Sequence, residues 1–178
     1  MAYFSLENFK ASVLGEGLAK TNRFEVRIIP PSGFDDAYTY SKKVSLYCET
    51  ASFPLLNINT KPHRIYGPVF QRPVTSEYGG EGIPLTFHLD QKMDVKVYFE
   101  NWIQNIVNRN TYNVAYQDDY TGEIELYQLN DIEEITYGIK LIEAFPRSMN
   151  LLELNNAAQN QTHRLTVLFA YRKWELIS

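Results

Sequence analysis

The sequence predicts a mainly β protein: one domain over residues 1–178, folded as an antiparallel β-barrel or sandwich with one flanking α-helix and a long extended arm. Aromatic residues make up 14% of the chain, and aromatic side chains pack well on pleated sheets. Several short segments alternate apolar and polar residues, which is typical of half-buried strands. Residues 92–108 instead have apolar residues at helical spacing.

The N-terminal region predicts a short helix followed by a strand. Residues 5–14 place apolar side chains at helical spacing behind Ser5, an N-cap residue type, and Gly15 and Gly17 end this helix. Residues 23–28 then alternate with period two, and Pro30-Pro31 stops the strand. We expect a second strand over residues 44–49, in which Val44, Leu46 and Cys48 share the inward face. Cys48 is interpreted as a small apolar residue of the core.

Residues 54–84 predict an extended arm. This stretch holds five of the eight prolines and is far longer than an ordinary connection, so we expect it to be functional or disordered. Its apolar and aromatic residues argue against disorder. An arm that buries them against another subunit fits the pattern, and an ordered flap on its own domain is the alternative.

The middle of the chain predicts a third strand and the principal helix. Leu85, Phe87 and Leu89 alternate as in a strand. The helix over 92–108 follows, and the Asp90 carboxylate just ahead of it can accept hydrogen bonds from its free N–H groups. The helix presents one apolar stripe, formed by Val95, Tyr98, Phe99, Trp102, Ile103, Ile106 and Val107.

The C-terminal third predicts a hairpin and a last strand. Residues 109–122 form a polar, Tyr-rich excursion, and strands over 123–129 and 135–143 flank a turn at Asn130-Asp131. We expect a turn at Pro146-Arg147-Ser148, a polar segment over 150–162, and a strand over 163–174. The inward face of that strand consists of Leu165, Val167, Phe169 and Tyr171.

Composition limits the function. The chain has 17 Lys+Arg against 21 Asp+Glu, a net charge of −4, whereas proteins that grip phosphate backbones are usually basic. A single cysteine excludes an internal disulfide and a multi-cysteine metal site. No signal peptide and no membrane-spanning segment is recognisable, so we expect a soluble intracellular protein.

No catalytic or cofactor site is predicted. His63, His88 and His163 form no metal-binding helix motif, and no nucleophile elbow, P-loop or dinucleotide fingerprint occurs. Asp118-Asp119 could bind a cation, but a lone acidic pair is usually solvated. We therefore expect no enzyme activity, no cofactor and no metal.

Five segments, in this order, resemble the inner tail tube proteins of contractile-tailed bacteriophages. Together they span about residues 19–175, and their order and spacing carry the resemblance. The segments are 19–26 (AKTNRFEV), 47–54 (YCETASFP), 98–102 (YFENW), 139–146 (IKLIEAFP) and 165–174 (LTVLFAYRKW).

The resemblance implies a β-barrel subunit that forms hexameric rings, stacked into a tube that conducts DNA. Tubes of type VI secretion systems and contractile bacteriocins share the fold. The implied partners are further copies of the chain and the tail sheath, tape measure and baseplate proteins, in a virion assembled in the host cytoplasm. Four strands from each of six copies, at about 4.8 Å per strand, give a circumference of about 115 Å, and a side-chain layer about 5 Å deep around the inside of the wall leaves a bore of about 27 Å.

The resemblance also places subunit contacts in the loop after the second strand, here the arm over 54–84. We expect its interface residues to include Ile65, Tyr66, Val69, Phe70 and Arg72. Passing DNA should not be held tightly, so lumen-facing side chains should be neutral or acidic. Strand periodicity selects Glu123, Glu125 and Glu143 for that role.

Three alternatives remain open at this point. The long arm, the enlarged 109–122 segment and the Asn/Gln-rich 150–162 segment leave open a ring of the same fold that initiates the tube at the baseplate. A monomeric barrel module could bind sugar or nucleic acid through the tyrosines of 109–122. An unrecognised enzyme would need a deep pocket lined by titratable groups with shifted pKa values.

Overall fold

Antiparallel strands form the framework of this protein. Its structure is a computed structural model, which describes residues 5–32, 34, 37–78, 82–157 and 159–177. The elements are α1 (Leu6–Glu16), β1 (Phe24–Ile29), α2 (Ala37–Leu46), β2 (Cys48–Thr50), β3 (Leu56–His63), β4 (Phe70–Tyr78), β5 (Ile83–His88), α3 (Asp94–Ile106), α4 (Gln117–Tyr120), β6 (Gly122–Leu129), β7 (Ile135–Met149), β8 (Arg164–Ala170) and β9 (Lys173–Leu176).

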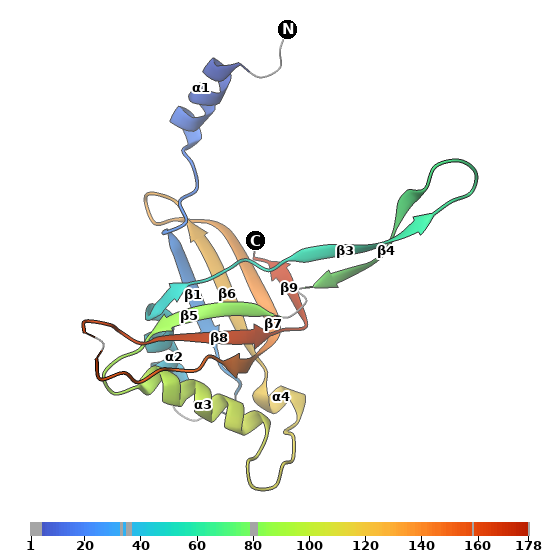
Figure 1. The fold of residues 1–178 in the computed structure, drawn as a ribbon. Coiled ribbons are helices and arrows are strands. Elements are labelled where there is room, and N and C mark those ends of the chain that lie inside the picture. Colours follow the sequence, from blue (N-terminus) through green and yellow to red (C-terminus); the bar gives the residue numbers. More distant parts are fainter. Residues whose placement is uncertain (1–4, 33, 35–36, 79–81, 158, 178) are drawn as a thin grey trace.

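Two sheets share the long strand β7 and enclose the core (Figure 1). The N-terminal half of β7 pairs with β6 and β9, and β6 pairs with β1; we call these four strands sheet I. The C-terminal half of β7 pairs with β8, which pairs with β5, and β5 pairs with β2; these form sheet II. The predicted mainly β barrel with a flanking helix is confirmed.

The core lies between the sheets and α3. Leu165, Val167 and Phe169 of β8 are fully buried, as their alternation predicts. The predicted principal helix is α3, whose apolar stripe covers one side of this core through Phe99 and Trp102. The helix starts as expected, because the Asp94 N–H donates to Asp90 Oδ1 at 2.9 Å. No helix within the described residues is long and apolar enough to cross a membrane.

The predicted strand over residues 44–49 is wrong, because residues up to Leu46 belong to helix α2 and only Cys48–Thr50 form a strand. Val44 is buried but Leu46 is 85% exposed, which a shared inward face would not allow. The helix packs beside β1, where the Ile28 N–H donates to Ser45 Oγ at 3.2 Å. This long-range contact and the ion pairs of Lys43 favour the helix over the local alternation.

Lys43 ties α2 to the start of α3. Its ammonium lies 2.9 Å from Asp90 Oδ2 and 2.6 Å from Asp94 Oδ2. The hydrogen bond from Lys43 lowers the pKa of the Asp90 carboxyl. Because this pKa is lower in the folded than in the unfolded protein, the ionised carboxylate stabilises the fold at pH values above the ordinary carboxyl pKa. The stabilisation is lost as the pH falls through the lowered pKa.

We therefore expect Lys43→Gln to lower the melting temperature at pH 7, and the difference from the parent protein to shrink as pH falls to about 2.5. Thermal unfolding followed by circular dichroism at several pH values measures this. Lys92→Gln, at an exposed position of the same charge, is the control. A difference in melting temperature that stays constant with pH would contradict a stabilising role of the ion pair between Lys43 and Asp90.

The predicted turn at Pro146-Arg147-Ser148 is also wrong, because β7 continues through it to Met149. The strand bends twice as it passes between the sheets. Glu143 has a positive φ of 55° at a bulge opposite β6, and the register with β8 shifts between Pro146 and Ser148. Proline is tolerated at such bulges, so Pro146, a residue type common in turns, lies inside a strand here. The single strand predicted over 163–174 is divided into β8 and β9.

The predicted N-terminal helix is confirmed as α1, with the Asn8 N–H donating to Ser5 Oγ at 3.1 Å and Gly17 at the C-cap. This helix projects away from the barrel (Figure 1). Leu6, Phe9 and Leu14 are accordingly exposed rather than packed.

Candidate functional site

The arm is a hairpin that extends far beyond the barrel (Figure 1). Among the described residues, its strands β3 and β4 pair only with each other, from Leu56 opposite Tyr78 to His63 opposite Phe70. A two-stranded hairpin alone is at best marginally stable in water, so a ribbon of this length is expected to need a partner surface. The predicted arm range also includes residues 79–81, which lie outside the described residues.

The predicted interface residues gather at the distal end of this hairpin. Tyr66 is 96% exposed, and Ile65, Val69 and Phe70 are also exposed. Lys61, Arg64 and Arg72 add three positive charges to residues 61–72, a segment without Asp or Glu. We call residues 61–72 the arm tip; it is at once apolar, aromatic and basic.

The base of the arm is held by aromatic contacts to sheet I. Phe53 meets Tyr137 of β7 with ring centroids 5.3 Å apart, and Tyr78 meets Trp174 of β9 at 6.3 Å. Asn59 Nδ2 donates to Glu77 Oε1 at 2.5 Å across the two strands. The direction of the arm is therefore fixed at its root, and among the described residues its strands form a sheet separate from the barrel.

The outward face of sheet I is a second distinctive surface, and it carries charges of both signs. Glu123 lies 2.5 Å from Lys140, and this hydrogen bond raises the pKa of Lys140. Glu125 accepts a hydrogen bond from the Tyr127 hydroxyl at 2.9 Å. By strand register, the charged residues on this face are Glu25, Arg27, Glu123, Glu125, Lys140, Lys173 and Glu175, three positive and four negative.

The structure brings two of the three predicted lumen residues together. Glu123 and Glu125 lie on the outward face of sheet I, two residues apart on β6. Glu143 lies at the bulge of β7, where it pairs with Arg172 at 2.6 Å and accepts a hydrogen bond from Gln117 of α4. Glu143 therefore lies where the register between β6 and β7 shifts, outside the regular alternation that carries Glu123 and Glu125.

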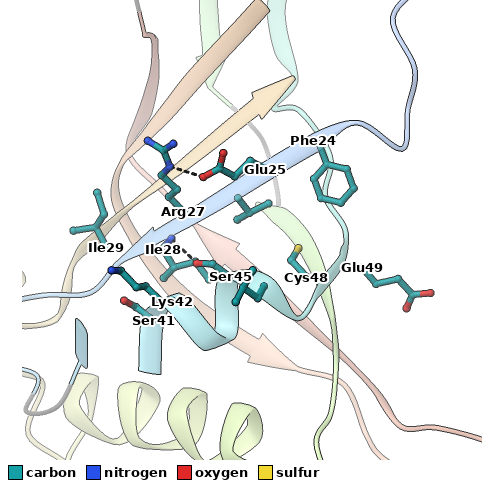
Figure 2. Close-up of a pocket in the computed structure, with 12 residues that line it drawn as sticks. Phe24, Glu25, Arg27, Ile28, Ile29, Ser41, Lys42, Ser45, Cys48 and Glu49 are labelled. Carbon is teal, nitrogen blue, oxygen red and sulfur yellow. Dashed lines mark hydrogen bonds and ion pairs between the residues drawn. The ribbon is translucent and has the colours of Figure 1, made fainter. Parts of the chain in front are cut away.

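A groove of about 690 Å³ lies where sheet I and sheet II fail to meet, and it is lined by residues of β1, α2 and β2 (Figure 2). Phe24, Ile28 and Cys48 line it together with Ser41 and Ser45. Burial raises the pKa of the Cys48 thiol to about 12, so this group is a neutral thiol at physiological pH. The predicted core role of Cys48 is therefore modified: it borders the groove and is only half-buried.

The described residues contain no cluster of three or more His, Cys, Asp or Glu side chains that could hold a metal ion. The histidines are separated: His63 contacts Phe70 on the arm, whereas His88 lies 3.6 Å from Glu49 at the end of β5. Asp118 and Asp119 are exposed on α4. The distinctive features of this chain are surfaces: the arm tip, the charged face and the free edges of β1 and β9.

Comparisons with known proteins agree over nearly the whole chain. A family model described as phage tail tube protein matches residues 19–177. No curated protein sequence matches significantly.

Three solved structures share the fold. A chain of the anti-feeding prophage baseplate is 16% identical with a TM-score of 0.63, over 90% of this chain and 95% of that one. A chain of the sheath–tube complex of an extracellular contractile injection system, PVC, is 17% identical with a TM-score of 0.63, over 94% and 97%. A chain of the PVC sheath/tube terminator is 17% identical with a TM-score of 0.65, over 92% and 99%.

Proposed function

This chain belongs to the phage tail tube protein family, and from that premise we propose that it is the repeating subunit of the inner tail tube of a contractile phage tail. Six copies form a ring, and the rings stack into a conduit for DNA. The tube contacts the tail sheath outside, the tape measure protein inside and the baseplate at its end. It belongs to the virion and is assembled in the host cytoplasm.

The observation that carries this proposal is the construction of sheet I. It contains four strands, and its outer strands β1 and β9 have no strand partner on their other side among the described residues. A free strand edge is a template for pairing with another chain. Joining β1 of one copy to β9 of the next extends sheet I around a closed ring, and six copies supply 24 strands.

The outward face of sheet I suits the wall of such a conduit. Its net charge is −1 per copy, from three positive and four negative side chains. Arg27 lies 2.7 Å from Glu25 and Lys173 lies 2.5 Å from Glu175, so two of the cations are already paired, as is Lys140. A wall of internally paired charges presents little net attraction to phosphate.

The assembly state of the purified protein tests the proposal. We expect light scattering to rise steeply with concentration as long polymers form, because edge pairing and stacking are both available to every copy. An assembly that stops at one ring layer would instead favour the tube-initiating ring at the baseplate. A protein that stays monomeric at high concentration would contradict the proposal and favour a monomeric binding module.

We also expect no measurable binding of duplex DNA, by the free subunit or by the polymer, at low salt. Each phosphate contact would add a salt-dependent attraction and slow the passage of DNA. Fluorescence anisotropy with a labelled duplex measures binding, and Glu123→Lys/Glu125→Lys, which changes the face from −1 to +3, is the positive comparison. Tight binding by the parent protein that weakens steeply with salt would contradict a passive conduit.

A further inference from the structure

The edge of β1 that faces away from β6 presents three residues to a further strand. Backbone groups along an antiparallel strand point alternately to its two sides. The Leu129 N–H donates to the Arg23 carbonyl at 2.9 Å, so the odd-numbered residues of β1 face β6. Phe24, Val26 and Ile28 therefore direct their backbone groups to the other side, where no strand pairs with β1 among the described residues.

One of these three groups already has a partner inside the subunit. The Ile28 N–H donates to Ser45 Oγ of α2 at 3.2 Å, beside the groove (Figure 2). Helix α2 is anchored by the two residues before Ser45: Val44 is buried in the core, and Lys43 forms its two ion pairs with the start of α3. Rotation of the half-buried Ser45 side chain therefore frees the Ile28 N–H without moving the helix.

Strand β9 offers the matching edge. The Ile177 N–H donates to the Gly138 carbonyl at 2.9 Å, so the odd-numbered residues of β9 face β7, and Trp174 and Leu176 direct their backbone groups to the free side. Leu176 lies opposite Ile139, which is fully buried, yet Leu176 itself is 62% exposed. Its side chain is on the core-facing side of sheet I, so a copy joined at this edge would receive it in its groove.

The backbone limits how the two edges can be joined. Antiparallel strands pair through residues whose backbone groups face each other. If Ile28 stays on Ser45, β1 offers only Phe24 and Val26 to the two free residues of β9. Completing both pairs then requires Val26 to lie opposite Trp174.

That register sets like charges against each other on the outward face of sheet I. By the alternation of the two strands, it places Arg27 opposite Lys173 and Glu25 opposite Glu175. Like charges directly opposite one another on neighbouring strands are destabilising. Both registers that place Ile28 opposite one of the two free residues of β9 avoid these contacts. The favourable join therefore needs the N–H that α2 holds.

We propose that Ser45 is a latch on ring closure. In the free subunit its hydroxyl holds the Ile28 N–H. In the ring, a carbonyl of β9 from the next copy takes its place, and Leu176 of that copy enters the groove. Because the contact with Ser45 must be given up first, it raises the concentration at which copies join. The inference rests on the proposed function, since it concerns how the copies of one ring are joined.

Ser45→Ala tests the latch, because it removes the hydroxyl and leaves the edge of β1 open. We expect the critical concentration for polymerisation to fall about fivefold, the factor that corresponds to one hydrogen bond of ordinary net strength. Ser45→Thr keeps a hydroxyl and should behave like the parent protein. Ser148→Ala, at an exposed serine of β7, is the matched control and should also leave the critical concentration unchanged. Sedimentation gives the critical concentration, and circular dichroism verifies folding.

The outcomes separate this inference from the proposed function. A parent protein that does not polymerise would overturn the proposed function itself. If the parent polymerises and Ser45→Ala has the same or a higher critical concentration, the latch alone is overturned. An equal fall in Ser148→Ala would overturn it as well, because the effect would then not depend on the edge of β1.

A structure of the polymerised parent protein tests the same exchange without any variant. We expect the Ile28 N–H to donate to a carbonyl of β9 in the next copy, with Ser45 Oγ turned away from it and Leu176 of that copy in the groove. A polymer in which Ile28 still donates to Ser45 would overturn the latch.

Discussion

Replacing residues 58–76 with an Asn-Gly turn will give a folded protein that no longer polymerises. Asn57 lies opposite Glu77 in the hairpin register, so a two-residue turn can join them without moving the base of the arm. The contacts of Phe53 with Tyr137 and of Tyr78 with Trp174 remain. Within the described residues the removed strands pair with one another, and the retained Glu77 loses the hydrogen bond from Asn59, so the free energy of unfolding should change by no more than about 2 kcal/mol.

Size-exclusion chromatography with light scattering measures the loss of assembly, and urea denaturation measures stability. A second variant separates arm length from arm chemistry: Ile65→Ser/Tyr66→Ser/Val69→Ser keeps the hairpin but removes exposed apolar side chains, and it should also fail to polymerise. If the shortened protein unfolds, the arm is a flap of its own domain. If it polymerises like the parent, the arm has no role in assembly.

Trp102→Ala will destabilise the subunit by about 3–5 kcal/mol, the usual cost of removing a large aromatic side chain from a core. Trp102 is fully buried in α3, with its ring centroid 6.0 Å from Tyr98 and 6.3 Å from Phe169. Its indole N–H also satisfies the Tyr120 carbonyl at 2.8 Å. The truncation therefore leaves both a cavity and a carbonyl without its donor.

Urea denaturation monitored through Trp174, the remaining tryptophan, gives the free energy of unfolding. Trp102→Phe is the matched control: it keeps a ring in the cavity and loses only the hydrogen bond and part of the volume, so its cost should be clearly smaller. An alanine variant as stable as the parent would show that the α3 stripe does not form the core.

The predictions from period-two alternation are confirmed for strands that have one face against the core and the other face outward. Val26 and Ile28 of β1 and Ile124 and Leu126 of β6 are buried, as alternation requires. The same rule failed at residues 44–46, where a helix is selected by contacts to β1 and to Asp90 and Asp94, far away in the sequence. A local pattern does not contain those contacts.

The arm shows a similar limit. Pro62 and Pro73 argue against a central strand, yet both lie in paired strands. A two-stranded ribbon has a free outer edge on each strand, so a proline without an N–H is tolerated there. Sequence alone placed Ile65, Tyr66, Val69, Phe70 and Arg72 in one exposed segment, but it did not reveal the hairpin that carries them away from the barrel.

The candidate surfaces were predictable to different degrees. Glu123 and Glu125 were placed on one strand face correctly, because β6 is regular there. Glu143 lies at the β7 bulge with a positive φ, where the alternation is interrupted, so periodicity alone does not determine its face. The segment between α3 and β6 was predicted only as a Tyr-rich excursion. Its bridge between Val107 and Val114 and the hydrogen bond from Trp102 to the Tyr120 carbonyl are tertiary contacts, which periodicity does not describe.

The central claim is that sheet I, joined through β1 and β9, forms the inner wall of a closed six-copy ring. Cryo-electron microscopy of the purified, polymerised protein tests it most directly. We expect stacked rings with six-fold symmetry and a bore of about 27 Å, set by 24 strands at about 4.8 Å and a side-chain layer about 5 Å deep. The outward face of sheet I, with Glu123 and Glu125, should line that bore. Filaments without a central channel, or rings whose channel is lined by sheet II or α3, would contradict it.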